Sequence, residues 1–144
     1  MVSKRESSSV LSFFIHIWST HMVLTTSAQL DEILCKFERN VPHVQATAVV
    51  STDGLVIASR LPKDVEEDRI GAMGAAILSI SSRSGEELDR GKMTRVLVEG
   101  TNGYILIRSI GEFAILVALV EKEVRLGMLF YECKNCIEKL SEIL

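Results

Sequence analysis

The feature that most constrains this chain is an uncharged stretch, IGAMGAAILSISS, which runs from Ile70 to Ser82. Charged residues flank it on both sides, at residues 66–69 and 83–87. On a helix with about 100° per residue, its large apolar side chains fall on one stripe. These are Ile70, Met73, Ile77 and Ile80. We expect this stripe to cover one face of a β-sheet.

A second stripe on the same helix is built mostly of small side chains. It consists of Gly71, Ala75, Leu78 and Ser82. A surface helix of a monomer normally carries charge on the side away from its core. The absence of charge here indicates that another helix packs against this side, and we expect the same helix of a second copy. The alternative is a helix enclosed in a larger domain, but the rest of the chain is too small to favour it.

Length and charge narrow the class of protein. A chain of 144 residues has room for one domain that buries roughly 68–70% of its extended surface. The formal charge of −3 and the lack of a basic run argue against nucleic-acid binding. Three cysteines, an odd number, indicate a reducing compartment without a disulfide framework. We therefore expect a cytoplasmic protein.

Residues 1–21 are expected to form an N-terminal arm, and residues 22–144 a single domain. The apolar run of the arm, Val10 to Trp18, is interrupted by polar residues and is much shorter than the about 20 residues of a membrane span. No small-x-small cleavage site follows it, as a signal peptide would require. The arm is then either disordered or membrane-touching, or an extension absent from the native protein. We favour an extension that is absent from the native protein, because Met22 directly precedes a predicted helix and would serve as an initiator.

The rest of the sequence alternates between helical and strand periodicity. Helices are expected at residues 27–40, from about 65 to 89 and from 123 to the end, and strands at 44–51, 55–60, 93–99, 104–110 and 113–120. The last strand is apolar on both faces and should be central. The order α-β-β-α-β-β-β-α predicts an α/β (α+β) fold. In it a five-stranded antiparallel sheet lies between the second helix and the first and third helices.

Local signals mark where these elements begin and end. Thr26 with Gln29, and Asp64 with Glu67, have the spacing of a capping box at a helix start. Pro42 should end the first helix, since proline disfavours the helical conformation of the residue before it. The pair Asp53-Gly54 favours a tight hairpin turn, because glycine adopts a positive φ at no steric cost.

Motifs that carry chemistry are largely missing. Cys133 and Cys136 form a Cys-x-x-Cys pair, but no second ligand pair completes a zinc site, and the pair lies inside a helix rather than at its N-terminus. We expect Cys133 to pack in the core with Cys136 as a bystander, and Cys35 to lie beside the core. The three histidines are scattered, without a nucleophile or carboxylate at a telling spacing. We therefore expect no enzyme activity, no cofactor and no metal.

Three segments resemble the Roadblock/dynein light-chain family. They are the hairpin VVSTDGLVIAS (49–59), the helix GAMGAAILSISS (71–82) and the run VEGTNGYILIRSIGEFAILVALV (98–120). The nearest branch is the archaeal and bacterial one, similar to the gliding-motility B (MglB-like) proteins. The resemblance covers about Ser27 to Leu144 and implies a profilin-like Roadblock fold.

The resemblance also implies a homodimer in which two sheets join edge to edge through the third strand, with the second helices lying across the joined sheet. Together with the small stripe, this gives an expected dimer interface of Gly71, Ala75, Leu78, Ser82, Thr94, Val96 and Val98. A partner surface would use the exposed remainder of the second helix, namely Ala72, Ser79, Arg83 and Glu86. Arg83, Arg90 and Arg95 match no family motif for a catalytic arginine, and we interpret them as ordinary surface or edge-strand residues.

Members of the family act as platforms and regulators of small Ras-like GTPases, or as light chains of motor complexes. The leading hypothesis is therefore a non-catalytic, dimeric GTPase regulator or scaffold, with a GTPase-activating role as in the bacterial branch. One alternative is a structural light chain or adaptor in a motor or membrane-tethering assembly. Another is a small-molecule sensor with a ligand between the sheet and its helices.

Overall fold

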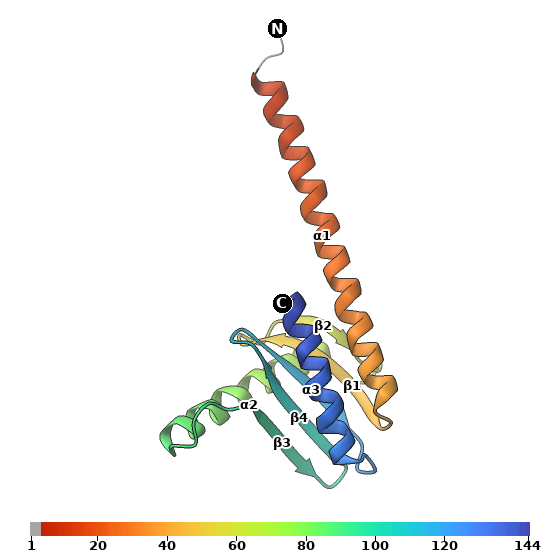
Figure 1. Cartoon of the computed structure of the whole chain (residues 1–144), viewed down its shortest axis with the longest axis vertical. Coiled ribbons are helices and arrows are strands. Elements are labelled where there is room, and N and C mark those ends of the chain that lie inside the picture. The colour runs from red at the N-terminus through yellow and green to blue at the C-terminus, as the bar shows by residue number, and fades with distance from the viewer. Residues whose placement is uncertain (1–3) are drawn as a thin grey trace.

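The computed structural model describes the backbone of residues 4–144 and the side chains of residues 9–19 and 26–144. The expected order of elements is confirmed (Figure 1). The helices are α1 (Lys4–Asn40), α2 (Glu67–Glu87) and α3 (Leu126–Ile143). The strands are β1 (Val44–Ser51), β2 (Val56–Arg60), β3 (Arg95–Gly100), β4 (Gly103–Ile110) and β5 (Ala114–Val120). Most element boundaries lie within three residues of those expected, and the start of α1 is the large exception.

The five strands form one antiparallel sheet in the order β2-β1-β5-β4-β3. The apolar strand β5 occupies the centre, as its sequence predicts, and pairs with β1 on one side and β4 on the other. Short hairpins produce this arrangement. At the β1–β2 turn Gly54 has φ +92°, and the amide of Ser51 donates to the carbonyl of Leu55 over 2.8 Å. Strands β2 and β3 are left at the two edges.

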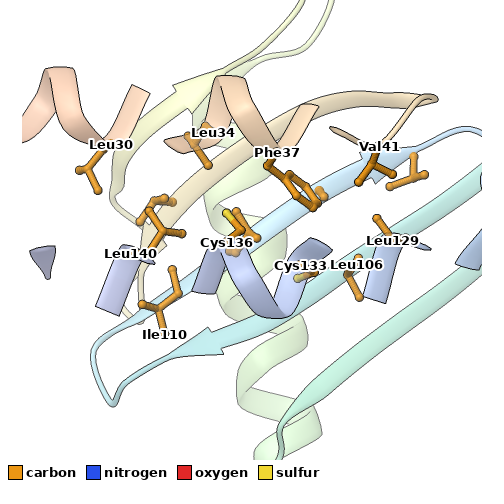
Figure 2. Close-up of a cluster of buried hydrophobic side chains, with 14 of the residues drawn as sticks. Leu30, Leu34, Phe37, Val41, Leu106, Ile110, Leu129, Cys133, Cys136 and Leu140 are labelled. Atoms are coloured by element: carbon orange, nitrogen blue, oxygen red, sulfur yellow. The ribbon is translucent and has the colours of Figure 1, made fainter. Parts of the chain in front are cut away.

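Helices cover both faces of the sheet, which confirms the predicted layers. The larger core lies between the sheet, α1 and α3, where Leu34, Phe37 and Leu140 are buried together (Figure 2). The smaller core lies between the sheet and α2, around Ile70, Ile107 and Val117. Burial of these side chains is the main stabilising term of the fold.

An ion-pair network ties α1 to the β1–β2 hairpin. Arg60 on β2 donates to Glu38 over 3.1 Å and to Asp31 over 3.1 Å, both on α1. These bonds raise the pKa of the Arg60 guanidinium. The fully buried hydroxyl of Thr47 donates to the same Glu38 carboxylate over 2.9 Å. The network therefore gives Thr47, the buried polar residue of β1, a hydrogen-bond acceptor.

The first helix is much longer than the sequence analysis predicts. It begins at Lys4 rather than Ser27, so the predicted capping pair of Thr26 and Gln29 lies inside it. No glycine or proline interrupts residues 4–40, and the helix ends at Asn40, shortly before Pro42, as expected. Of the predicted arm, residues 1–3 lie outside the described part, and the rest projects away from the domain as helix (Figure 1). An origin of translation at Met22 stays a prediction.

The predicted cap of α2 is also wrong. The N-cap residue is Glu66, in extended conformation and without a side-chain cap hydrogen bond, so Asp64 does not fill that role. The carboxylate of Glu67 instead accepts a hydrogen bond from the Ser59 hydroxyl over 2.9 Å. Glu67 and Asp68 in the first turn still favour the helix electrostatically, since negative charge stabilises a helix N-terminus.

Within the described part of the chain, none of the helices has the length and apolar character needed to traverse a bilayer.

Candidate interaction surface on α2 and β3

Helix α2 approaches its own sheet with its small side chains. Gly71 and Gly74 are buried, and a methyl group has no room at either position. A Cβ atom on Gly71 would lie 2.5 Å from the carbonyl oxygen of Gly54, and one on Gly74 would lie 2.8 Å from the side chain of Val117. The helix backbone therefore packs directly on the hairpin turn and on the central strand.

This packing corrects part of the predicted roles of the two stripes of α2: Ile70 and Ile77 pack in or against the smaller core, as expected, but other members do not follow the prediction. Gly71 was expected at a dimer interface, but its surroundings are filled by its own hairpin. Met73 and Ile80 were expected to cover the sheet, but their side chains are 56% and 69% exposed. The physical reason is that small residues allow the closest backbone approach, which turns the bulky side chains outward.

The other members of the small stripe are half-buried. Ala75 lies beside Gly54, since a Cβ on Gly54 would be 3.6 Å from the Ala75 methyl. Leu78 packs against the smaller core, and Ser82 is partly covered one turn further on. Part of the uncharged small stripe, from which the sequence analysis infers a second copy, is therefore covered by the same subunit. A role of Ala75, Leu78 and Ser82 at a dimer interface stays a prediction.

The side of α2 that faces away from the sheet is exposed and uncharged over three turns. We call this the open face; it consists of Ala72, Met73, Ala76, Ser79 and Ile80. The residues expected to form a partner surface, Ala72, Ser79, Arg83 and Glu86, are all exposed. Arg83 lies at the end of this face and pairs with Glu87 over 3.0 Å. The open face is thus an apolar surface that ends in charge.

A second apolar area lies beside α2, over the β3 edge of the sheet. Helix α2 contacts β1, β2 and β5, so it leaves much of β3 uncovered. Val96 is half-buried and Val98 is 38% exposed, while Thr94 lies just before the strand and is exposed. Because β3 is an edge strand, one side of its backbone has no neighbour in the sheet.

Two grooves connect the open face with this edge. The first runs beside α2 and is lined by residues that include Val65, Met73 and Ile77. The second lies beside Val98 on β3. Both grooves share Ile105 and Leu119, so the apolar surface continues from the helix to the edge strand. The sequence could have revealed this surface through the spacing of Gly71, Gly74 and Ala75, which identifies the covered side of α2.

The arginines considered as catalytic fingers have local roles. Arg90 donates to the carbonyl of Leu88 over 3.0 Å at the end of α2. The guanidinium of Arg95 lies 3.8 Å from the centre of the Phe130 ring, on the opposite face of the sheet from α2. These contacts agree with the interpretation of both as ordinary surface or edge residues.

The cysteines of α3 pack in the larger core. Burial raises the pKa of the Cys133 thiol to about 11 and that of Cys136 to about 12, so both are protonated at neutral pH. Cys133 lies in the core as expected, but Cys136 is buried too and is not a bystander (Figure 2). Cys35 on α1 is half-buried beside the core.

One cluster of possible metal ligands escaped the sequence analysis. The side-chain ligand atoms of His43, Glu121 and Glu123 lie within 4.8 Å of one another, brought together at the ends of β1 and β5. His43 Nδ1 is 3.5 Å from a Glu121 carboxylate oxygen. His43 and Glu123 are exposed and Glu121 is half-buried, and the His43–Glu121 pair is satisfied as an ion pair whenever the imidazole is protonated.

Comparisons with known proteins identify relatives of this chain in sequence and in fold. The uncharacterized protein MJ1340 of Methanocaldococcus jannaschii is 33% identical over 111 residues, which cover 77% of this chain and 96% of that protein. Among solved structures, a Roadblock/LC7 domain from Streptomyces avermitilis superposes with a TM-score of 0.74 at 22% identity, covering 78% of this chain and 94% of that one.

Two further structures have the same fold at lower identity. The gliding protein MglB from Thermus thermophilus gives a TM-score of 0.76 at 19% identity, over 82% of this chain and 90% of that one. Profilin II of Acanthamoeba castellanii gives 0.50 at 14% identity, over 69% of this chain and 86% of that one, in agreement with a profilin-like fold. The family model for the Roadblock/LC7 domain matches residues 30–120. The chain therefore belongs to the Roadblock/LC7 family.

Proposed function

We propose that this protein is a non-catalytic homodimeric platform that binds and regulates a small Ras-like GTPase. Membership of the Roadblock/LC7 family and the likeness in fold to MglB support this role. The observation that carries it is the apolar surface that continues from the open face of α2 to the edge strand β3. In a single protomer this apolar surface is exposed to solvent, and exposed apolar surfaces of this kind are typical of protein–protein contacts.

Pairing through β3 would use both parts of this surface. Two β3 strands side by side would satisfy each other's free backbone groups and extend the sheet across the dimer. The partner's helix would then shield the parts of Val96 and Val98 that stay accessible in a single protomer. This arrangement would place the two α2 helices on one face of the joined sheet, where they offer a composite surface to a GTPase.

The dimer is best tested on the side of the open face that borders the groove toward β3, which Met73 lines and on which Ile80 follows two turns later. Ala72 and Ser79 lie about 100° further round the helix, on the side left for a GTPase. Ile80 is 69% exposed, so Ile80→Glu should leave the protomer folded but place a charge where the second copy packs. Phe113→Glu is a matched control, because Phe113 is also a large exposed apolar residue but lies in the β4–β5 turn. Light scattering should show a dimer for the wild type and Phe113→Glu, and a monomer for Ile80→Glu. A dimeric Ile80→Glu would contradict pairing through α2.

Binding of a GTPase is tested separately from the dimer. Ala72→Arg and Ser79→Arg should reduce capture of a Ras-like GTPase while light scattering still shows a dimer, since both side chains are exposed at the expected partner surface. The capture should be stronger for GTPase loaded with a GTP analogue than with GDP. Equal capture in both nucleotide states would favour the light-chain or adaptor alternative, and no capture of any Ras-like GTPase would reject the proposal.

A further inference from the structure

The projecting half of α1 carries an unusual density of exposed apolar side chains. Seven large apolar residues between residues 9 and 19 are 48% to 66% exposed. They are Val10, Leu11, Phe13, Phe14, Ile15, Ile17 and Trp18. We call residues 9–19 the apolar arm. Among the described side chains of α1, those that pack in the core begin at Leu30, and the arm projects away from the domain, which does not cover it (Figure 1).

The arm is amphipathic, and its polar side is narrow and contains no aspartate, glutamate, lysine or arginine. At about 100° per residue, Ser9, Ser12, His16 and Ser19 fall on one stripe, with spacings of three, four and three residues. The seven large apolar side chains fill the remaining arc, which is more than half of the cylinder. No acidic or basic residue other than histidine occurs from Ser7 to Leu30.

This distribution does not suit a paired helix of a second copy. The seam of a two-stranded coiled coil uses two of every seven positions, and charged flanking residues fix the partner and register. The arm has seven large apolar residues in eleven positions and no flanking charge. Pairing of two arms would therefore leave most of the aromatic surface, such as Phe13 or Trp18, in water. Among the described residues, no helix has the combined length and apolar character that would let it cross a membrane.

We propose that the apolar arm binds a lipid surface, lying in the interfacial plane with its serine and histidine stripe toward water. A wide apolar arc that includes two phenylalanines and a tryptophan fits the boundary between headgroups and acyl chains, where aromatic rings are favoured. Because the polar stripe holds no lysine or arginine, insertion of apolar side chains provides the affinity. Lys4 and Arg5 ahead of the arm add a minor attraction to anionic lipid. This inference is independent of the proposed GTPase partner.

The chain reports on this binding with its own fluorescence. Trp18 is the only tryptophan in the sequence, so intrinsic emission arises from the arm alone. The full chain is titrated with phosphatidylcholine vesicles, and co-sedimentation is measured in parallel. We expect the emission to move to shorter wavelength, quenching by aqueous iodide to fall, and quenching by brominated lipid to appear. Binding should change little between low and physiological salt, since it depends on apolar insertion.

Two glutamate variants separate the faces of the arm. Phe14→Glu places a charge in the centre of the apolar arc and should weaken vesicle binding roughly ten- to a hundredfold, the loss of one buried aromatic side chain. Ser12→Glu adds the same charge on the polar stripe and should bind nearly as wild type. Equal loss for both variants would overturn the proposal.

Two outcomes without lipid contact would also overturn it. If Trp18 emission shifts with protein concentration in the absence of vesicles and is unchanged by them, the arms associate with one another. If Trp18 stays accessible to iodide at saturating lipid while the protein is folded by circular dichroism, the arm does not bind lipid surfaces.

Discussion

Substitution of Gly71 by alanine gives the sharpest test of how α2 packs. The new Cβ would lie 2.5 Å from the Gly54 carbonyl oxygen and must move to at least 3.0 Å, a shift of 0.5 Å or more. The atom it meets is backbone of a tight turn. Hydrogen bonds from the Ser51 amide to Leu55 and from the Leu55 amide to the Ser51 hydroxyl hold that turn. The helix must therefore move away from the hairpin, at the expense of the smaller core.

Overpacking of this kind costs about 1–3 kcal/mol, while replacing a helical glycine by alanine returns up to about 1 kcal/mol. With the full return, we expect a net loss of up to about 2 kcal/mol in the free energy of unfolding, measured by urea denaturation at fixed protein concentration. Gly127→Ala in α3 is the matched control, because a Cβ there meets no atom within 4 Å and stability should rise slightly. A Gly71→Ala protein as stable as Gly127→Ala would refute the described contact of α2 with the hairpin.

Three further predictions concern the other side of the sheet. Glu38→Ala removes the acceptor of the buried Thr47 hydroxyl and should lower the free energy of unfolding by about 1–3 kcal/mol, as measured in urea. Leu140→Ala empties a fully buried site and should cost about 2–5 kcal/mol in the same assay, whereas a loss below about 1 kcal/mol would contradict its place in the core. Cys133 and Cys136 keep their protons to pH values of about 11 and 12 when folded, but ionise near 9 when unfolded, so stability should fall as pH rises above about 9. A double Cys133→Ala, Cys136→Ala variant should show a shallower fall between pH 9 and 11, and an unchanged slope would argue against buried thiols.

The sheet and its layers could be predicted because local sequence signals mark each strand and each turn. Turn residues such as Asp53-Gly54 fix the hairpins locally, and the two apolar faces of β5 allow it only the centre. The buried side chains of α1 and α3 could be predicted from helical periodicity in the same way. In these elements local preference and tertiary packing agree, which makes the pattern sufficient.

The orientation of α2 could not be obtained from hydrophobicity alone. Both of its stripes are uncharged, so polarity does not tell which one faces the sheet. Backbone approach decides: Gly71 and Gly74 permit it, and Met73 would prevent it. Gly71, expected at the dimer interface, is therefore buried against its own hairpin, whereas Met73 and Ile80, expected to cover the sheet, are exposed.

The length of α1 was missed for a different reason. Ser, Thr and Gln near residue 26 have the spacing of a helix start, but the same residues are accepted inside a helix when nothing upstream breaks it. The informative signal is the absence of glycine and proline from residues 4–40. Clusters such as His43 with Glu121 were beyond sequence reasoning, because only the pairing of β1 with β5 brings them together.

The two borders of the sheet have unequal capacity for growth. Strand β2 is short, and α1 lies against it. Arg60 on β2 forms an ion pair with Glu38 on α1, and Pro62 follows shortly after the end of the strand. At β3 the backbone is bare. In the proposed dimer, a two-fold pairing of β3 with β3 would occupy this edge in both subunits, so the joined sheet would end at two subunits rather than continue into a fibre.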